Sequence, residues 1–294
     1  MNIIGHKDIL RSLVSISKFK NVPPLLFYGQ FGIGKSTVAL YFCGLCNPKQ
    51  EEKIYKLIHP DIIFISVGEL KPYGPRPENF DNLKNISIEQ IRNLKIELQK
   101  PPIYAKKRFV IIMDADMLTI EAQNSLLKIL EEYQTRTTFI LITSNYLKIF
   151  PTILSRTLKI SFKCLSFEEF LSYEYNWNYD IKLIYDISEG SIGIAKQLNE
   201  YPINDWLNIL NEVRSVKQVL EILKTIQDSR DFMNFLRVFR FYYKKKYVQS
   251  SNEIYYKILK HSLEIEDLIK RYTSIEASLI SLFSITLSGA LSNK

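Results

Sequence analysis

The residues best suited to chemistry lie at positions 29–37, where the chain reads Gly-Gln-Phe-Gly-Ile-Gly-Lys-Ser-Thr. This is the G-x-x-x-x-G-K-S pattern of a phosphate-binding loop. Its glycines let backbone N–H groups turn inward around a phosphate, Lys35 reaches the terminal phosphates, and the Ser36 hydroxyl binds Mg²⁺. A relic loop that no longer binds is the alternative. The predicted nucleotide-binding residues here are Gly29, Gly32, Gly34, Lys35, Ser36 and Thr37.

Acidic residues follow another apolar run, at residues 109–113. A P-loop enzyme needs a carboxylate at the end of this strand to orient the magnesium shell, usually followed by a second that activates water. Only Asp114 stands where the strand should end. Asp116 would share its face only if the strand continued, and the helix start that follows disfavours this. We therefore expect a degenerate acidic site, in which Asp114 and Ser36 would hold Mg²⁺ if a nucleotide is bound.

Strand-like and helical segments alternate around these residues. Apolar runs at residues 25–28, 62–67, 109–113 and 138–143 are typical of buried strands. Segments 36–46, 87–99 and 119–132 have helical character, and Thr119 is placed to cap the last of them. The alternation predicts an α/β fold with a parallel sheet covered by helices on both faces.

Beyond residue 162 the pattern becomes helical. Ser166 begins a helix with two glutamates in its first turn, and segments 206–223, 231–247 and 254–272 carry apolar residues at helical spacing. We place boundaries near residues 161 and 202. The expected domains are a P-loop nucleotide-binding domain (1–161), a small helical lid domain (162–202) and an all-helical C-terminal domain (203–294).

Further stretches make the sequence similar to one protein family. They are Ile-Glu-Gln-Ile-Arg at 88–92, the run 114–132 that contains Asn-Ser-Leu-Leu-Lys-Ile-Leu-Glu-Glu, and Pro-Thr-Ile-Leu-Ser-Arg at 151–156, with His-Pro-Asp at 59–61. Together they resemble the AAA+ subunits of the bacterial DNA polymerase III clamp loader. The resemblance implies an AAA+ core with a parallel sheet, followed by the helical lid and by a collar domain used for oligomerisation.

The resemblance also assigns roles to single positions. Counted back from Asn124, Asp114 matches the second, catalytic acidic position of the family. Met113 then stands where the ATP-hydrolysing gamma/tau motors carry a magnesium-orienting aspartate, and a thioether cannot hold the water shell of a hard cation. Gly193 stands where the motors carry an arginine that contacts the phosphates. Both differences resemble the delta-prime branch of the family. Asn145 matches a polar sensor near the terminal phosphate, with a turn cap as the alternative.

Arg156 resembles the arginine finger that clamp-loader subunits project into a neighbour's ATP site, where it would act in trans on the transferring phosphate. A solvated or salt-bridged arginine is the alternative.

The resemblance thus implies a delta-prime subunit of the DNA polymerase III holoenzyme, a DNA-directed DNA polymerase, that helps load the sliding clamp onto primed DNA during replication. Its implied partners are the gamma/tau motor and delta subunits, the sliding clamp and, through the assembly, primer-template DNA. It would bind ATP with Mg²⁺ and be weak or inactive as an ATPase. Two alternatives stay open: a self-sufficient gamma/tau-type motor that uses Asp114 alone, and a relic P-loop interaction module.

The composition limits the partners, the metal sites and the location that we expect for this protein. The 294 residues include 39 Lys+Arg against 31 Asp+Glu, a net charge of +8 that favours acidic partners but also fits a lysine-rich composition. Two nearby thiolates, Cys43 and Cys46, do not close a tetrahedral site, and Cys164 is remote, so we predict no zinc.

Segment 237–247 is basic and aromatic, and we expect core aromatics with solvated lysines rather than a nucleic-acid site. We expect a cytoplasmic protein without a membrane segment.

Overall fold

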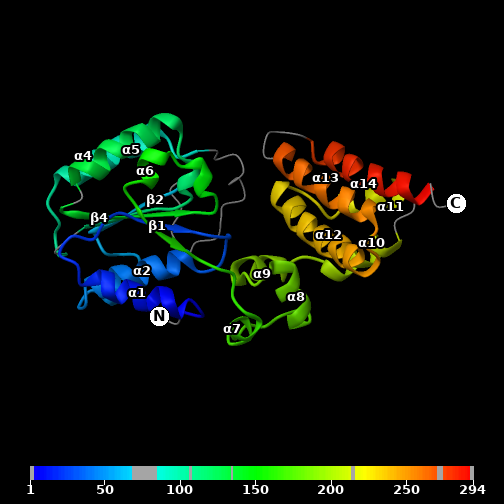
Figure 1. Cartoon of the computed structure of the whole chain (residues 1–294), viewed down its shortest axis with the longest axis horizontal. Helices are drawn as coiled ribbons and strands as arrows, with labels where there is room; N and C mark the ends of the chain where they lie inside the picture. The colour runs from blue at the N-terminus through cyan, green and yellow to red at the C-terminus, as the bar shows by residue number, and fades with distance from the viewer. Residues whose placement is uncertain are drawn as a thin grey trace. The chain divides into compact units, whose positions relative to one another are not determined.

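Five parallel strands form one sheet in the part of the chain that the computed structural model describes, which is residues 3–67, 85–105, 108–133, 135–212, 216–269 and 274–291. The spatial order is β2-β3-β4-β1-β5, and every neighbouring pair is parallel. The predicted α/β fold with a parallel sheet is confirmed (Figure 1). The strands are β1 (Leu25–Tyr28), β2 (Ile62–Ile65), β3 (Arg108–Ile112), β4 (Thr137–Thr143) and β5 (Leu158–Ser161).

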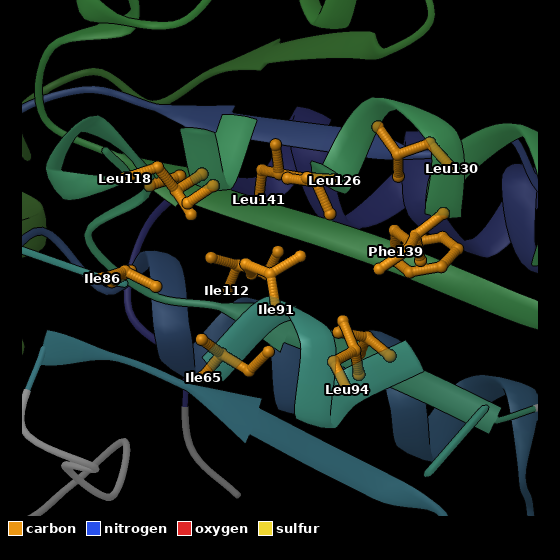
Figure 2. Close-up of a cluster of buried hydrophobic side chains, with 14 of the residues drawn as sticks. Ile65, Ile86, Ile91, Leu94, Ile112, Leu118, Leu126, Leu130, Phe139 and Leu141 are labelled. Atoms are coloured by element: carbon orange, nitrogen blue, oxygen red, sulfur yellow. The ribbon is translucent and has the colours of Figure 1, made fainter. Parts of the chain in front are cut away.

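Helices cover both faces of this sheet (Figure 1). One face carries α1 (Lys7–Ser17) and α2 (Lys35–Cys46), and the other carries α4 (Ile88–Gln99), α5 (Ile120–Tyr133) and α6 (Pro151–Leu154). Strand β3 is buried on both sides because its residues alternate between two cores. Val110 and Ile112 join the core beneath α4 and α5, whereas Phe109 and Ile111 join the core beneath α1 and α2. Figure 2 shows the first of these cores, where Ile112 lies among side chains of α4, α5 and β4.

Polar side chains cap the N-termini of several helices. Thr119 accepts a hydrogen bond from the Ala122 N–H at the start of α5, as predicted. Ser87 forms a capping box with Gln90 at the start of α4, and Ser166 does so with Glu169 at the start of α7 (Phe167–Leu171). The remaining short elements of this region are α3 (Glu51–Tyr55) and the 3₁₀ turns η3 (Ala115–Met117) and η4 (Tyr146–Lys148).

The fifth strand was not predicted. Strand β5 lies at the edge of the sheet and pairs with β1 alone, with Leu25 opposite Leu158. Three of its four residues are exposed, so it carries no buried apolar run. An edge strand held by backbone hydrogen bonds gives a weak sequence signal, because its side chains do not need to be apolar.

The chain divides into two compact units. The first comprises Met1–Glu174 together with Gly190–Gly193, and the second comprises Tyr175–Glu189 and Ile194–Lys294. The three-domain division at residues 161 and 202 stays a prediction. The helices of the C-terminal half are α8 (Ile181–Ser188), α9 (Ile192–Leu198), α10 (Ile203–Glu212), α11 (Val216–Leu223), α12 (Ser229–Ser250), α13 (Glu253–Ile269) and α14 (Ile275–Leu291).

Aromatic side chains build the core of the second unit. Trp206 of α10 packs edge-to-face against Phe235 of α12, and Phe239 packs edge-to-face against Phe283 of α14. Arg240, in the basic and aromatic segment, forms an ion pair with Glu266 at 2.5 Å. Among the described residues no helix is long and apolar enough to cross a membrane.

Candidate nucleotide-binding site

The loop between β1 and α2 contains three glycines in a backbone conformation that side chains disfavour. Gly29, Gly32 and Gly34 have φ angles of +146°, +77° and +97°. At Gly29 a Cβ would also lie 2.3 Å from the Phe162 carbonyl oxygen. Gly34 is the N-cap of α2, so the loop ends at a helix N-terminus, where backbone N–H groups favour a bound anion. The backbone therefore suits the predicted phosphate cradle.

The P-loop lysine is buried against its own loop. Lys35 Nζ donates to the carbonyl oxygens of Gly29, at 2.7 Å, and Gln30, at 2.6 Å. These carbonyls compensate the cost of burying the ammonium group. Ser36 and Thr37 follow in the first turn of α2 and are half-buried. A bound phosphate would compete with the two carbonyls for the ammonium group.

The next three carbonyls of the loop are bound by distant segments. The Ser191 hydroxyl donates to the Phe31 carbonyl at 2.8 Å, and the Gly193 N–H donates to the Gly32 carbonyl at 2.9 Å. The Ile33 carbonyl lies 2.8 Å from Nε2 of His6, whose ring also packs edge-to-face on Phe162. His6 and Ser191 could not be assigned to the loop from the sequence, because no local spacing links them to residues 31–33. The hydrogen bonds that hold these three carbonyls fix the orientation of the peptide planes of the loop.

The acidic residues that follow β3 do not continue this strand. β3 ends at Ile112, Met113 follows half-buried, and Asp114 has a left-handed backbone with a φ angle of +50°. Asp116 lies in η3, where its carboxylate accepts from the Thr143 hydroxyl at 2.5 Å and the Ser144 N–H at 3.4 Å. Asp116 thus binds the end of β4 and does not extend the strand, which agrees with the doubt raised by the sequence.

The predicted sensor closes a turn. Asn145 follows β4, which lies between β3 and β1 in the sheet, and its exposed side chain accepts from the Leu147 N–H at 3.1 Å. This side chain caps η4, which is the alternative considered from the sequence. Because parallel strands end at the same edge, the sheet brings the P-loop, Asp114 and Asn145 to one edge. A contact of Asn145 with phosphate stays a prediction.

Arg156 is exposed but paired. Its Nη2 lies 2.7 Å from Oε1 of Glu131 in α5, and its Nη1 donates to the Thr152 carbonyl at 3.0 Å. The side chains of Arg156 and Glu131 remain 43% and 51% exposed. The predicted salt-bridged alternative is therefore present in this chain. An ion pair of such exposure is weak and easily exchanged.

A buried glutamine without a distinctive sequence signal fixes the segment that leads to Arg156. Gln123 of α5 donates to the Lys148 carbonyl at 3.1 Å and accepts from the Phe150 N–H at 2.8 Å. Its predecessor in the chain, Ala122, contributes to the core instead. Gln123 thus joins α5 to the start of α6 through both ends of its amide.

A second buried anchor organises the loop after α4. Asp61 is fully buried, and its carboxylate accepts from the backbone N–H groups of Ile103, Tyr104 and Ala105 at 2.7, 2.7 and 2.8 Å. Burial raises the pKa of Asp61, but these hydrogen bonds and His59 outweigh it, so the pKa lies below its usual value. The His-Pro-Asp sequence therefore has a structural role here.

The three cysteines lie in different environments. Cys43 is buried in α2, where burial raises the pKa of its thiol well above the usual value. Cys46 is half-buried and Cys164 is exposed. No group of three or more His, Cys, Asp or Glu side chains that could hold a metal occurs among the residues described. The absence of zinc stays a prediction.

The five-stranded parallel sheet, with a P-loop after β1 and a helical C-terminal half, defines an AAA+ protein of the clamp-loader class. The model of one family, described as DNA polymerase III, delta subunit, matches residues 5–166, which is more than half of the chain. This chain therefore belongs to that family.

Curated relatives agree with this assignment, and one solved structure has the same fold. Replication factor C subunit 3 of Schizosaccharomyces pombe is 30% identical over 166 residues, 56% of this chain and 42% of the relative. The replication factor C small subunit of Sulfurisphaera tokodaii is 29% identical over 206 residues, 65% and 55% of the two chains. The chain thus spans about half the length of these relatives. A gamma subunit-related protein of DNA polymerase III from Thermotoga maritima has the same fold, with a TM-score of 0.56, 17% identity and coverage of 95% and 98%.

Proposed function

We propose that this chain is a clamp-loader subunit of the delta-prime type, which binds ATP with Mg²⁺ but hydrolyses it poorly. It works in an assembly with gamma/tau motor and delta subunits and helps to place the sliding clamp on primer-template DNA. Family membership supports the clamp-loader role. The observation that carries the finer proposal is the contrast between a glycine cradle suited to phosphate and a strand end that offers Met113.

The residues present fit a nucleoside triphosphate. The left-handed glycines give the loop the required backbone, Lys35 supplies a positive charge at the loop, and the Ser36 hydroxyl stands at the helix start as a magnesium ligand. Bound Mg²⁺ would supply positive charge against the phosphates. Asp114 would take part through the water shell of the ion, and Asn145 would face the terminal phosphate.

Poor hydrolysis follows from two departures at the catalytic end. Met113 offers no oxygen to a hard cation. Gly193 offers no cation to the phosphates, whereas a motor of this family would place an arginine there.

The trans-acting role of Arg156 fits its surroundings. Its guanidinium is exposed and is held by one exposed carboxylate, so a neighbour's phosphates can compete for it at low cost. An arginine supplied in trans to a phosphoryl-transfer site is worth about 10³-fold or more in rate. The proposed subunit thus hydrolyses ATP poorly at its own site and assists hydrolysis at the site of a neighbouring subunit.

Nucleotide binding and turnover of the purified protein test this proposal, alone and with partner subunits. We expect a fluorescent ATP analogue to bind with Mg²⁺, Lys35→Ala to abolish binding, and Lys159→Ala, an exposed lysine of β5, to leave it unchanged. Turnover of the protein alone at roughly 1 per second or faster, lost in Lys35→Ala, would identify a motor. Lack of binding by the wild-type protein would identify a relic P-loop module.

A further inference from the structure

The segment Gly190–Gly193 lies against the P-loop, although its sequence neighbours on both sides belong to the second compact unit. Ser191 reaches the Phe31 carbonyl through its hydroxyl, and Gly193 reaches the Gly32 carbonyl through its backbone N–H. The Gly190 carbonyl accepts from the Leu165 N–H at 3.4 Å. Three hydrogen bonds thus fix this short segment to the P-loop unit.

Glycine is required at position 193 by proximity. A Cβ built on Gly193 would lie 2.6 Å from the Gly32 Cα and 3.0 Å from the Gly32 carbonyl oxygen. These are backbone atoms of the P-loop, which cannot rotate away as a flexible side chain could. Gly193 itself lies in α9, where alanine would otherwise be the better helix former. Any side chain at position 193 would push the segment off the loop.

We infer that Gly193 is a positioning residue of the nucleotide site. Its missing side chain lets Gly190–Gly193 close on the P-loop, and the two hydrogen bonds to the carbonyls of Phe31 and Gly32 hold the loop in its phosphate-binding conformation before a nucleotide arrives. In motor subunits of this family an arginine at this position contacts the phosphates. In this chain the same position binds the P-loop through its backbone N–H. The consequence for nucleotide affinity rests on the proposed function, whereas the anchoring of the loop does not.

Amide hydrogen exchange of the full-length protein without nucleotide tests the anchor. We expect the backbone amides of residues 29–37 and 190–198 to exchange about tenfold or more faster in Gly193→Ala, because each lost hydrogen bond is worth roughly twofold to tenfold and two are lost. Ser191→Ala removes one bond without adding atoms, so it should give a smaller increase even if Gly193→Ala folds poorly. Ser191→Thr keeps the hydroxyl and should restore the wild-type rate. Gln197→Ala, on the same helix, is the matched control.

Binding of a fluorescent ATP analogue to the same variants tests the positioning role. We expect the Kd to rise about tenfold in Gly193→Ala and less in Ser191→Ala, with Ser191→Thr and Gln197→Ala near wild type. Unchanged exchange over residues 29–37 in Gly193→Ala would overturn the anchor. Faster exchange with an unchanged Kd would overturn the positioning role. If the wild-type protein does not bind the analogue, the proposed nucleotide binding fails, while the exchange rates still decide whether the anchor exists.

Discussion

The ion pair between Arg156 and Glu131 predicts that Glu131→Gln increases ATP hydrolysis by an assembled clamp loader. If Arg156 acts on a neighbouring subunit, Glu131 competes with the neighbour's phosphates for the guanidinium. With side chains 43% and 51% exposed, the pair is worth about 0.2–1 kcal/mol. Removing it should raise the DNA- and clamp-stimulated rate by about 1.4-fold to fivefold where the arginine limits turnover.

The chain offers a closely matched control. Glu132 follows Glu131 in α5 and pairs with Lys95 at 2.9 Å, with side chains 47% and 42% exposed. Glu132→Gln therefore removes a similar surface pair without freeing Arg156. The assay is steady-state ATP hydrolysis by a reconstituted loader with an active motor subunit, together with the melting temperature of each variant. Arg156→Ala should lower the assembled rate strongly and leave nucleotide binding by the isolated subunit unchanged.

Equal rates for Glu131→Gln, Glu132→Gln and wild type would refute the competition between Glu131 and phosphate. The Arg156→Ala variant tests the larger claim. If a loader that contains it assembles normally and hydrolyses ATP at the wild-type rate, the role of Arg156 in trans is refuted, because Arg156 is then an ordinary surface arginine.

Three other predictions concern the strand end and the buried anchors. Met113→Asp should strengthen nucleotide binding in a Mg²⁺-dependent way by restoring a carboxylate, and equal affinities with and without Mg²⁺ in a folded variant would contradict the register of this strand. Asp61→Asn should cost about 2–4 kcal/mol in urea unfolding at neutral pH, because a buried amide nitrogen must then face a backbone N–H donor and the charge that these donors bind is lost. Since the pKa of Asp61 is lowered on folding, its contribution is present above the ordinary value of about 3.9 and is lost as the pH falls through the folded-state value. The stability gap between wild type and Asp61→Asn should therefore shrink in acid, with Asp8→Asn, an exposed residue, as control. Gln123→Leu should lower stability by about 1–3 kcal/mol through the unpaired Phe150 N–H and Lys148 carbonyl, and a loss under 0.5 kcal/mol would contradict that role.

Local rules were sufficient for the four buried strands and for several helices of the first unit. The four buried strands were visible as apolar runs, and Thr119 and Ser166 marked helix starts that the structure contains. Strand β5 was not visible, because backbone pairing with β1 makes it a strand while its side chains stay exposed. The helical spacing over residues 206–223 agrees with the structure, where residues 206–212 lie in α10 and residues 216–223 in α11.

The P-loop could be predicted because a phosphate cradle needs glycines and a lysine at fixed spacing. Its supports could not be predicted. His6 and Ser191 contact residues 33 and 31, which are 27 and 160 positions away, and these bonds depend on the fold rather than on spacing. Gly193 was interpreted from the sequence as the loss of an arginine, whereas the structure adds a close contact with Gly32.

The sheet order has a consequence for how this chain folds during synthesis. β1 ends at residue 28, but its two partners are β4 (Thr137–Thr143) and β5 (Leu158–Ser161), so its apolar residues have no strand to pair with until residue 143 is made, and the second partner is complete only at residue 161. At ribosomal speeds of about 5–20 residues per second, the interval from residue 28 to residue 161 lasts roughly 7–27 s. During that time Leu25, Leu26 and Phe27, all fully buried in the finished sheet, lack their final partners. The strand that carries the P-loop is therefore among the first made and among the last completed, and slow synthesis or a truncated chain would leave it exposed to aggregation.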